Sequence, residues 1–438
     1  MSLKQTFIIS IALFLLRLPC LSQVTFSSVE DTWRYADTHN ITVRNATYEL
    51  DKTAAARKQA YMAFAPQVTA SANFTNNINL QTTLIPAIIF DKNAAAGAVY
   101  PAQFGQKYIY QGGVTAQLDL LNLQTWYNVQ IVAETEAMNK ASLANVKKNI
   151  YQQLAAQYYS YLLMKEAARL AGESREITDS VYLSVEHKLE EGTVNESIAD
   201  LAKINKERAE QTLITAQYQA ITALNNIKAL LNLSLADSIQ VNATLGSIME
   251  QHTEAALTED PVVRQAYYQA RVAMSRVRAA NAAYIPVISA SYSSTTQQND
   301  NKLEPFQNGP AWYPASFLSL RATWNIFTGG TRWLQSKQNK ITYYESTMQY
   351  EAAQKQAAIN DENLRLAYMK ARAVLEKSGN IMKLSADNYT HITNRYEAGI
   401  ATIDDRLNAF SDYINYQNQY LNSLSDALVQ LYLLKIRQ

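Results

Sequence analysis

The chain has 438 residues, of which 18% are charged, and its formal net charge is +1. Nucleic-acid-binding proteins carry a strongly basic face, so this balance gives no support for a nucleic-acid partner. The chain has only 12 glycines and 9 prolines, and no proline lies between Pro101 and Pro261 or after Pro314. Because a proline inside a helix costs about 3 kcal/mol or more, these two stretches are free to form very long helices.

Residues 1–22 are expected to be a secretory signal peptide, because a lysine precedes an apolar run at 7–16. Cys20 and Ser22 supply the small residues that precede a cleavage site. The alternative is that Cys20 is the lipidated first residue of the mature chain. The apolar run is shorter than the ~20 residues of a membrane-spanning helix, and no other segment is long enough. Any membrane crossing is therefore expected to use strands.

The sequence contains an internal repeat. Residues 40–75 align with residues 260–295 without a gap, at a constant spacing of 220 residues. Further along, matched glycines recur at a spacing of 207 residues: Gly172 with Gly379, and Gly192 with Gly399. Solenoid repeats have periods of ~20–50 residues, so this unit is far too long to be one of them. The repeat predicts two copies of one large module, 23–240 and 241–438.

Two strands follow the first helix of each copy, because the spacing of apolar residues changes there from 3.6 to 2. In the first copy they are expected at about 67–77 and 111–121, joined by a polar, irregular loop. In the second copy they are expected at about 287–297 and 317–327. Some ten residues that are apolar on one face and polar on the other are typical of a transmembrane β-barrel strand. The positions expected to face lipid are Leu118, Leu120, Leu320 and Trp324.

The pattern alone also fits an ordinary half-buried strand in a soluble sheet. Asp119 and Arg321 on the polar face, together with the signal peptide, favour the membrane strand. Four strands cannot close a transmembrane barrel, which needs at least eight. An open edge in lipid would leave backbone groups unpaired, at several kcal/mol each. The chain is therefore expected to associate with further copies of itself, whose number the strand count leaves open.

A helical hairpin of exceptional length follows each pair of strands. The helices are expected at about 125–191 and 193–233 in the first copy, and at about 331–398 and 400–437 in the second. At 1.5 Å per residue, a helix of ~65 residues extends on the order of 100 Å and needs partner helices along its length. Gly192 and Gly399 are expected in the turns, as glycine commonly ends a helix. A fibrous coiled coil would share this periodicity, but paired strands would not interrupt it.

No catalytic constellation is found. The four histidines are scattered, without the spacing of a metal site. Gly329 and Gly330 are not followed by the Lys-Ser/Thr of a phosphate-binding loop. The chain is therefore expected not to be an enzyme and to hold no cofactor or metal.

The order of elements and several segments resemble the TolC-type outer membrane efflux proteins, the outer membrane factor family. The similar segments are 30–40, 282–290, 324–330 and 396–399 followed by Asp405. The resemblance covers essentially the whole mature chain. It implies a mainly α protein with a transmembrane β-barrel portion. As a homotrimer, it would form a twelve-stranded β-barrel continuous with a twelve-helix periplasmic α-barrel.

The resemblance also implies the function and the partners. The chain would be the outer-membrane exit duct of a tripartite efflux system in a Gram-negative bacterium, passively conducting small molecules across the periplasm and the outer membrane. Its partners would be a periplasmic adaptor protein, an inner-membrane transporter and outer-membrane lipid. One alternative is the exit duct of a type I protein-secretion system, which has the same architecture. A different class of alternative is a structural coiled-coil protein of the cell envelope.

The resemblance places a periplasmic gate at the second hairpin tip, at Tyr396, Asp405 and Asn408. Asn408 stands where the family has a second aspartate, and Ala401 where it has an arginine. The alternative for Asp405 is an acid at a helix N-terminus, stabilised by the helix dipole. The tip residues expected to contact the adaptor are Gly192, Gly399, Glu191 and Arg395.

Overall fold

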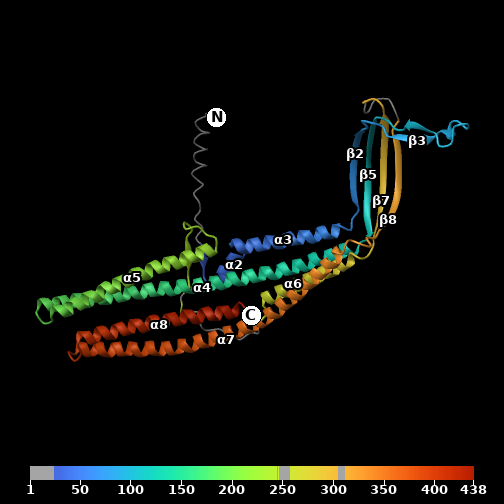
Figure 1. The fold of residues 1–438 in the computed structure, drawn as a ribbon. Coiled ribbons are helices and arrows are strands. Elements are labelled where there is room, and N and C mark those ends of the chain that lie inside the picture. The colour runs from blue at the N-terminus through green and yellow to red at the C-terminus, as the bar shows by residue number, and fades with distance from the viewer. Residues whose placement is uncertain (1–23, 244, 246–256, 304–310) are drawn as a thin grey trace, which may run out of the picture. The chain divides into compact units, whose positions relative to one another are not determined.

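The computed structural model describes residues 24–243, 245, 257–303 and 311–438. The expected signal peptide and Cys20 lie outside the described residues. The chain divides into two compact units, and each is described here by itself (Figure 1). Unit 1 comprises Met1–Asp51, Met138–Ala266 and Gln349–Gln438, and unit 2 comprises Lys52–Ala137 and Tyr267–Met348.

Unit 2 contains a four-stranded antiparallel sheet in the order β2-β5-β7-β8 (Figure 1). Its strands are β2 (Gln67–Asn76), β5 (Tyr108–Leu121), β7 (Val287–Asp300) and β8 (Tyr313–Thr323). The first repeat supplies the hairpin β2-β5 and the second supplies β7-β8, and the two hairpins join through β5 and β7. Within the described part of the chain, β2 and β8 each have a strand on one side only.

The two faces of this sheet differ in polarity, because side chains alternate along each strand. Leu118 lies opposite Ala290, which lies opposite Leu320, so the sheet has an apolar row on one face. Asp119 and Arg321 both lie opposite Ser289 and form a polar row on the other face. Leu320 is 71% exposed, so no other described part of this chain covers its side chain.

The last strand lies four residues earlier than the sequence pattern predicts, at Tyr313–Thr323 instead of 317–327. It includes Pro314, which an edge strand tolerates because a missing N–H on its free side breaks no ladder bond. Trp324, expected within the strand, follows its end, and its indole Nε1 donates to the carbonyl of Tyr284 at 3.0 Å. Trp324 therefore holds the strand end to the residues just before β7.

The segment expected to be an irregular loop contains a second, smaller hairpin. Its strands are β3 (Thr82–Pro86) and β4 (Val99–Gln103), with a short 3-10 helix at Ala87–Ile89. Prolines at 86 and 101 obscured these strands, but both strands of a two-stranded ribbon are edges and tolerate proline. Another small element not foreseen is the parallel pairing of β1 (Val24–Phe26) with β6 (Ile239–Val241) in unit 1.

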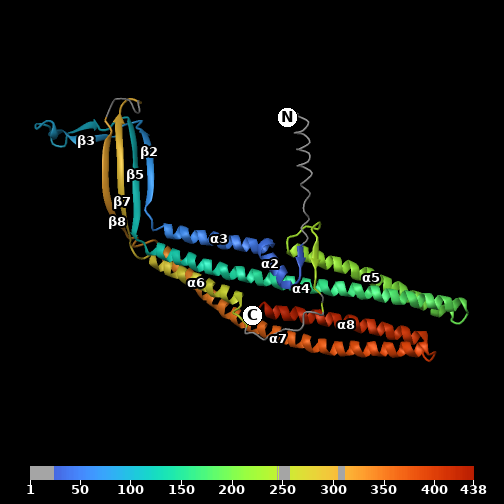
Figure 2. The same ribbon diagram turned by 180° about the vertical axis from the view of Figure 1, so that it is seen from behind.

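The helices agree closely with those expected. The short ones are α2 (Val29–His39), α3 (Ile41–Met62) and α6 (Pro261–Ala282). The long ones are α4 (Leu123–Glu190), α5 (Glu196–Leu230), α7 (Thr331–Glu397) and α8 (Ile403–Lys435), which form the hairpins α4-α5 and α7-α8 (Figure 2). Among the described residues, no helix is both long enough and apolar enough to cross a membrane.

The core of unit 1 joins the two hairpins around buried tyrosines. Tyr158 and Tyr159 of α4 are at most 1% exposed and belong to one apolar cluster with Leu428 of α8. The ring of Trp33 in α2 stacks on Tyr151 with centroids 5.1 Å apart, and its Nε1 donates to the carbonyl of Tyr151 at 3.1 Å. Tyr151, Tyr158 and Tyr159 thus pack the helices of unit 1 against one another.

A buried network of charges lies beside this core. The guanidinium of Arg437 binds both carboxylate oxygens of Asp361, at 2.9 and 2.8 Å. Its Nε also lies 3.6 Å from Asp260 Oδ2, which accepts a 2.7 Å hydrogen bond from Lys148 Nζ. Burial alone would raise the pKa of Asp260, but the Lys148 hydrogen bond, a bond from the backbone N–H of Val262 and the nearby cations together lower it.

Candidate functional site

The turn of the second hairpin is built around Gly399. Its φ of 74° lies in the left-handed region that favours glycine. The N–H of Gly399 donates to the carbonyl of Tyr396 at 3.0 Å, and the N–H of Ile400 donates to the carbonyl of Arg395 at 2.8 Å. These bonds satisfy carbonyls at the end of α7, as in helix C-terminal glycine motifs. The turn thereby places Tyr396 and Arg395 at the tip.

The first hairpin turns in the same way at Gly192, whose φ is 71°. The N–H of Thr193 donates to the carbonyl of Lys188 at 2.9 Å. The next helix begins at once, because the side-chain oxygen of Asn195 accepts from the N–H of Ile198 at 3.0 Å. The two tips thus share one backbone design, as the repeat predicts.

Asp405 forms a capping box at the start of α8. Its Oδ2 accepts from the N–H and the hydroxyl of Thr402, at 2.9 and 2.8 Å, while its own N–H donates to Thr402 Oγ1 at 3.1 Å. The backbone and side-chain bonds from Thr402, with the charge of Arg395, lower the pKa of Asp405. In the single chain Asp405 therefore caps the N-terminus of α8, as the alternative interpretation predicts. Its carboxylate is ionised at neutral pH.

Tyr396 connects the two hairpin tips. Lys188 of α4 donates a 2.8 Å hydrogen bond from Nζ to the hydroxyl of Tyr396 in α7. The guanidinium carbon of Arg406, in α8, lies 5.3 Å from the centroid of the same ring. A cation at this distance is attracted to an aromatic face by roughly 0.5–1 kcal/mol at an exposed site. The tips are therefore linked through a tyrosine held between two cations.

Sequence reasoning did not identify Lys188. It lies 208 residues before Tyr396 in the chain, so no local pattern connects them. Arg406 lies in α8 beside the Tyr396 ring, while Ala401 holds the position where the resemblance implies an arginine. The structure supplies positive charge at this tip from the other hairpin and from within α8.

The residues expected to contact an adaptor lie at exposed positions. A Cβ added to Gly192 or to Gly399 would meet no heavy atom within 4 Å, so both turns are open to a partner. The carboxylate of Glu191 lies 3.6 Å from His187 Nδ1, and its side chain is 57% exposed. Arg395 is exposed as well. These four residues lie on the two tips, where a partner can reach them.

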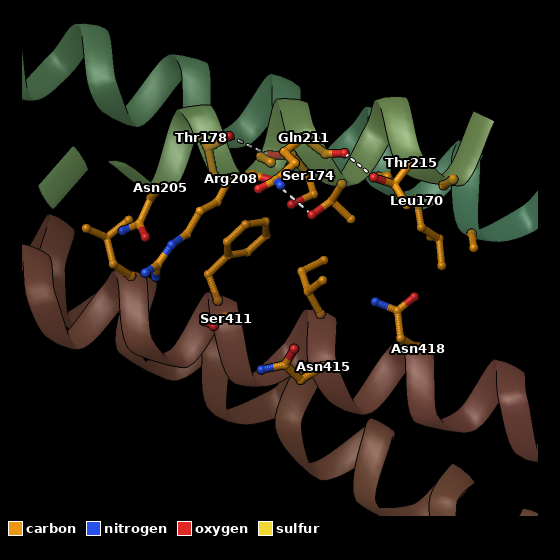
Figure 3. A pocket seen from close by; sticks show the side chains of 18 of the residues that line it. Leu170, Ser174, Thr178, Asn205, Arg208, Gln211, Thr215, Ser411, Asn415 and Asn418 are labelled. Carbon is orange, nitrogen blue, oxygen red and sulfur yellow. Dashed lines mark hydrogen bonds between the residues drawn. The ribbon is translucent and has the colours of Figure 1, made fainter. Parts of the chain in front are cut away.

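A cavity of about 950 Å³ lies between the hairpins, lined by α4, α5 and α8 (Figure 3). Much of its lining on α8 is polar and follows a spacing of three and four residues: Asn408, Ser411, Asn415, Asn418 and Asn422. In the close-up, Arg208 reaches from α5 toward α8. Asn408, expected at the gate, thus faces this seam, whereas the acid that lines it is Asp404 and not Asp405.

The cavity is bounded toward the tips by an apolar cluster. Val181 and Val185 of α4 are buried there with Ala202 of α5 and Leu407 of α8. On the far side the tyrosine-rich core joins α4 to α8. The seam between the hairpins is therefore apolar at both ends, and its middle is lined by amide side chains of α8 together with apolar side chains such as Leu170 and Phe410.

Within the described residues, no group of histidine, cysteine, aspartate or glutamate side chains is arranged to hold a metal ion. Of the positions expected to face lipid, Leu118 and Leu320 lie in one apolar row of the sheet through Ala290. Leu120 is 56% exposed and lies two residues further along β5. Trp324 stands apart from this row, beyond the end of β8.

Comparison with known proteins points to one family. A family model described as outer membrane efflux protein matches residues 35–233 and 253–434. No curated protein matches the chain. Several solved structures of similar fold do, at identities low enough that they show the fold alone.

CusC has 16% sequence identity and a TM-score of 0.75, with 93% of this chain and 90% of that chain covered. The outer membrane protein VceC from Vibrio cholerae has 18% identity and a TM-score of 0.74, covering 93% and 95%. The MtrE outer membrane channel of Neisseria gonorrhoeae has 18% identity and a TM-score of 0.75, covering 93% and 88%. The family model covers most of the chain in two blocks, one in each repeat, and the chain belongs to the outer membrane efflux protein family.

Proposed function

We propose that the chain is the outer-membrane exit duct of a tripartite efflux system, passively conducting small molecules when an adaptor and an inner-membrane transporter are engaged. The observation that carries this proposal is the sheet β2-β5-β7-β8. It has one apolar face and two edge strands that lack an outer neighbour within the described residues. Lipid tolerates such a sheet only when its edges are paired.

Closure requires further copies of the chain. The edge β8 of one copy would pair with the edge β2 of the next, so that no backbone group is left unpaired in lipid. Three copies would give twelve strands, which exceeds the minimum of eight for a closed barrel. The hairpins α4-α5 and α7-α8 of three copies would supply a twelve-helix tunnel in the periplasm. Strand pairing requires further copies, and the resemblance sets their number at three.

The tips are the proposed gate and docking surface. In the trimer, Asp405 and Asn408 would lie near the periplasmic opening, and the link from Lys188 to Tyr396 would hold the two hairpins of each copy together. An adaptor would contact the exposed tip residues Gly192, Glu191, Arg395 and Gly399. Opening would then break the cation–tyrosine link and separate the hairpins along the amide-lined seam.

The overall proposal is tested by fractionation and by conductance. We expect the protein in the outer-membrane fraction as a heat-resistant trimer that forms channels in planar bilayers. A soluble periplasmic rod without channel activity would refute the duct and favour the structural coiled-coil protein. Export of a dye against export of a fused protein substrate, in cells that carry the cognate adaptor and transporter, separates small-molecule efflux from protein secretion.

The gate needs a test that separates charge from helix capping, since Asp405 does both. Asp405→Asn removes the charge, whereas Thr402→Val removes the capping partner and keeps the carboxylate. We expect lower cation preference and altered conductance in Asp405→Asn and nearly unchanged cation preference in Thr402→Val. Equal effects of the two substitutions would show that Asp405 only caps α8.

A further inference from the structure

The hairpin formed by β3 and β4 carries more exposed apolar surface than a solvated loop needs. We call residues 78–104 the β3-β4 arm. Its large apolar side chains are 48–69% exposed at Leu84, Ile88, Ile89, Phe90, Val99 and Tyr100. The arm has two charged residues, Asp91 and Lys92, which are adjacent and opposite in sign. Large apolar side chains that gather in one exposed segment suggest a site of contact with a protein or a membrane.

Both faces of the arm are apolar. Leu84 lies opposite Pro101, and the next pair along, Ile85 and Tyr100, points to the other face. A two-stranded hairpin has no second layer on which to bury either face, and such hairpins are at best marginally stable alone. Within the described residues, no further strand pairs with β3 or β4. The arm therefore needs a partner outside its own sheet.

The base of the arm is firmly attached to the large sheet. The N–H of Asn77 donates to the carbonyl of Lys107 at 2.7 Å, and its side-chain amide donates to the carbonyl of Gln106 at 2.9 Å. The N–H of Lys107 in turn donates to Asn301 Oδ1 at 3.1 Å, which ties the base to the end of β7. These bonds attach the base of the arm to the large sheet of unit 2.

The arm extends past one edge of the sheet (Figures 1 and 2). In Figures 1 and 2 the strands stand side by side with β2 and β8 at the two sides, and the arm extends on the side of β8. β8 is the edge on which the proposed function places β2 of a neighbouring copy. The inference therefore rests on that proposed function, and it specifies an additional contact between the copies.

A matching surface lies at the end of the other edge strand. Phe74, two residues before the end of β2, is 54% exposed. Its ring centroid is 5.1 Å from that of Tyr110 and 6.1 Å from that of Tyr108, both in β5. The register places all three side chains on one face, because Phe74 lies opposite Tyr110 and Asn76 lies opposite Tyr108. We call these three residues the aromatic platform.

We propose that the β3-β4 arm of one copy packs on the aromatic platform of the next copy and so fastens the subunits together beside the β8–β2 pairing. The occupant of the apolar arm is thus a second copy of this chain. The contact is head-to-tail, since arm and platform are different surfaces, and it closes on itself in a ring of three. The arm extends toward the edge where the neighbour's β2 lies, which favours this partner over a lipid surface.

Disulfide cross-linking of the full-length protein tests the contact. Asn76→Cys lies beside the platform on the same face, and it is combined in turn with Ile88→Cys, Phe90→Cys or Tyr100→Cys in the arm. On oxidation we expect at least one pair to yield covalent dimers and trimers on denaturing gels, which disappear on reduction. The control is Thr75→Cys with the same arm cysteines, because Thr75 is adjacent but points to the opposite face. Cys20 is the only native cysteine. Variants with one introduced cysteine therefore show which cross-links, if any, form through Cys20.

The outcomes separate this proposal from the proposed function. If lysine-directed cross-linking finds no trimer of the wild-type protein, the proposed function itself fails. If the wild type is a trimer but no arm cysteine links to Asn76→Cys, or Thr75→Cys links equally well, the arm contact is wrong. A fluorophore on the arm cysteine that is quenched by brominated lipid in proteoliposomes would also overturn the proposal, because lipid would then cover the arm.

Discussion

Arg437→Met is expected to be among the most destabilising single substitutions in unit 1. The side chain of Arg437 is only 4% exposed, and it makes two hydrogen bonds to Asp361 and a longer contact with Asp260. Methionine fills a similar volume without a charge. The substitution leaves the carboxylate of Asp361 without its partner, whereas Asp260 keeps the hydrogen bond from Lys148.

The magnitude follows from the burial of these groups. Breaking a buried ion pair by removing one partner costs roughly 3–5 kcal/mol, because the remaining charge is left without compensation. The side chain of Asp361 is 24% exposed and keeps some hydration, so we take the lower end, about 3 kcal/mol. A change of that size raises the population of the locally opened state roughly 100-fold.

Amide hydrogen exchange of the purified protein measures the population of the locally opened state, region by region. We expect exchange in the last turns of α8 and in α7 around Asp361 to be about 100-fold faster in Arg437→Met. The matched control is Arg365→Met, because Arg365 lies 3.9 Å from Glu362 with both side chains at least 60% exposed. Such a surface pair contributes about 0–1 kcal/mol.

A second substitution is expected to rescue the protein. In the double variant Arg437→Met with Asp361→Leu no carboxylate is left unpaired at this position, so we expect much of the lost protection to return. If Arg437→Met exchanged no faster than Arg365→Met, or if the double variant were the less protected, the network would not stabilise this end of the hairpins as argued.

Three further predictions concern the sheet, the tips and pH. Gly113→Ala should hinder assembly, at a cost of about 1–3 kcal/mol, because the added Cβ would lie 2.7 Å from a backbone oxygen of β7. The control is Gly112→Ala, whose Cβ would meet no atom nearer than 3.9 Å, and it should resemble wild type on heat-stability gels. Lys188→Met removes the hydrogen bond to Tyr396 and should raise the fraction of open channels in planar bilayers. An unchanged fraction would show that the link from Lys188 to Tyr396 does not hold the hairpins together. The pKa of Asp260 is lowered in the folded chain, so its carboxylate contributes its full stabilisation of the fold above the pKa of the unfolded chain, about 3.9. This contribution is lost as the pH falls through the pKa of the folded chain. Acid should therefore weaken exchange protection more in wild type than in Asp260→Asn.

Much of the fold could be predicted from local chemistry. Gly192 and Gly399 were expected in tip turns, and both adopt the positive φ that such turns require. The proline-free stretches contain the four long helices. The β3-β4 arm was not foreseen, because its strands are five residues long and two prolines lie among them. Short strands carry too little alternation to be separated from a loop.

The gate shows where local reasoning stops. A single acid near a helix start has two roles that look alike in sequence, and Asp405 is found bonded to Thr402. Its neighbour Asp404, which no sequence pattern distinguished, lines the cavity between the hairpins. Which of two adjacent side chains faces a seam depends on how α8 is rotated against α4 and α5. That rotation is set by packing and not by the residues of α8 alone.

By itself, the sequence determined the order of elements, the duplication and the turns. These depend on residues close together in the chain, through helix period, strand alternation and the conformational range of glycine and proline. Only the tertiary structure decided which distant side chains meet: Lys188 with Tyr396, Arg437 with Asp361 and Asp260, and the apolar row that runs from β5 through β7 to β8. The physical reason is that these contacts join segments tens to hundreds of residues apart, and packing and register select their geometry.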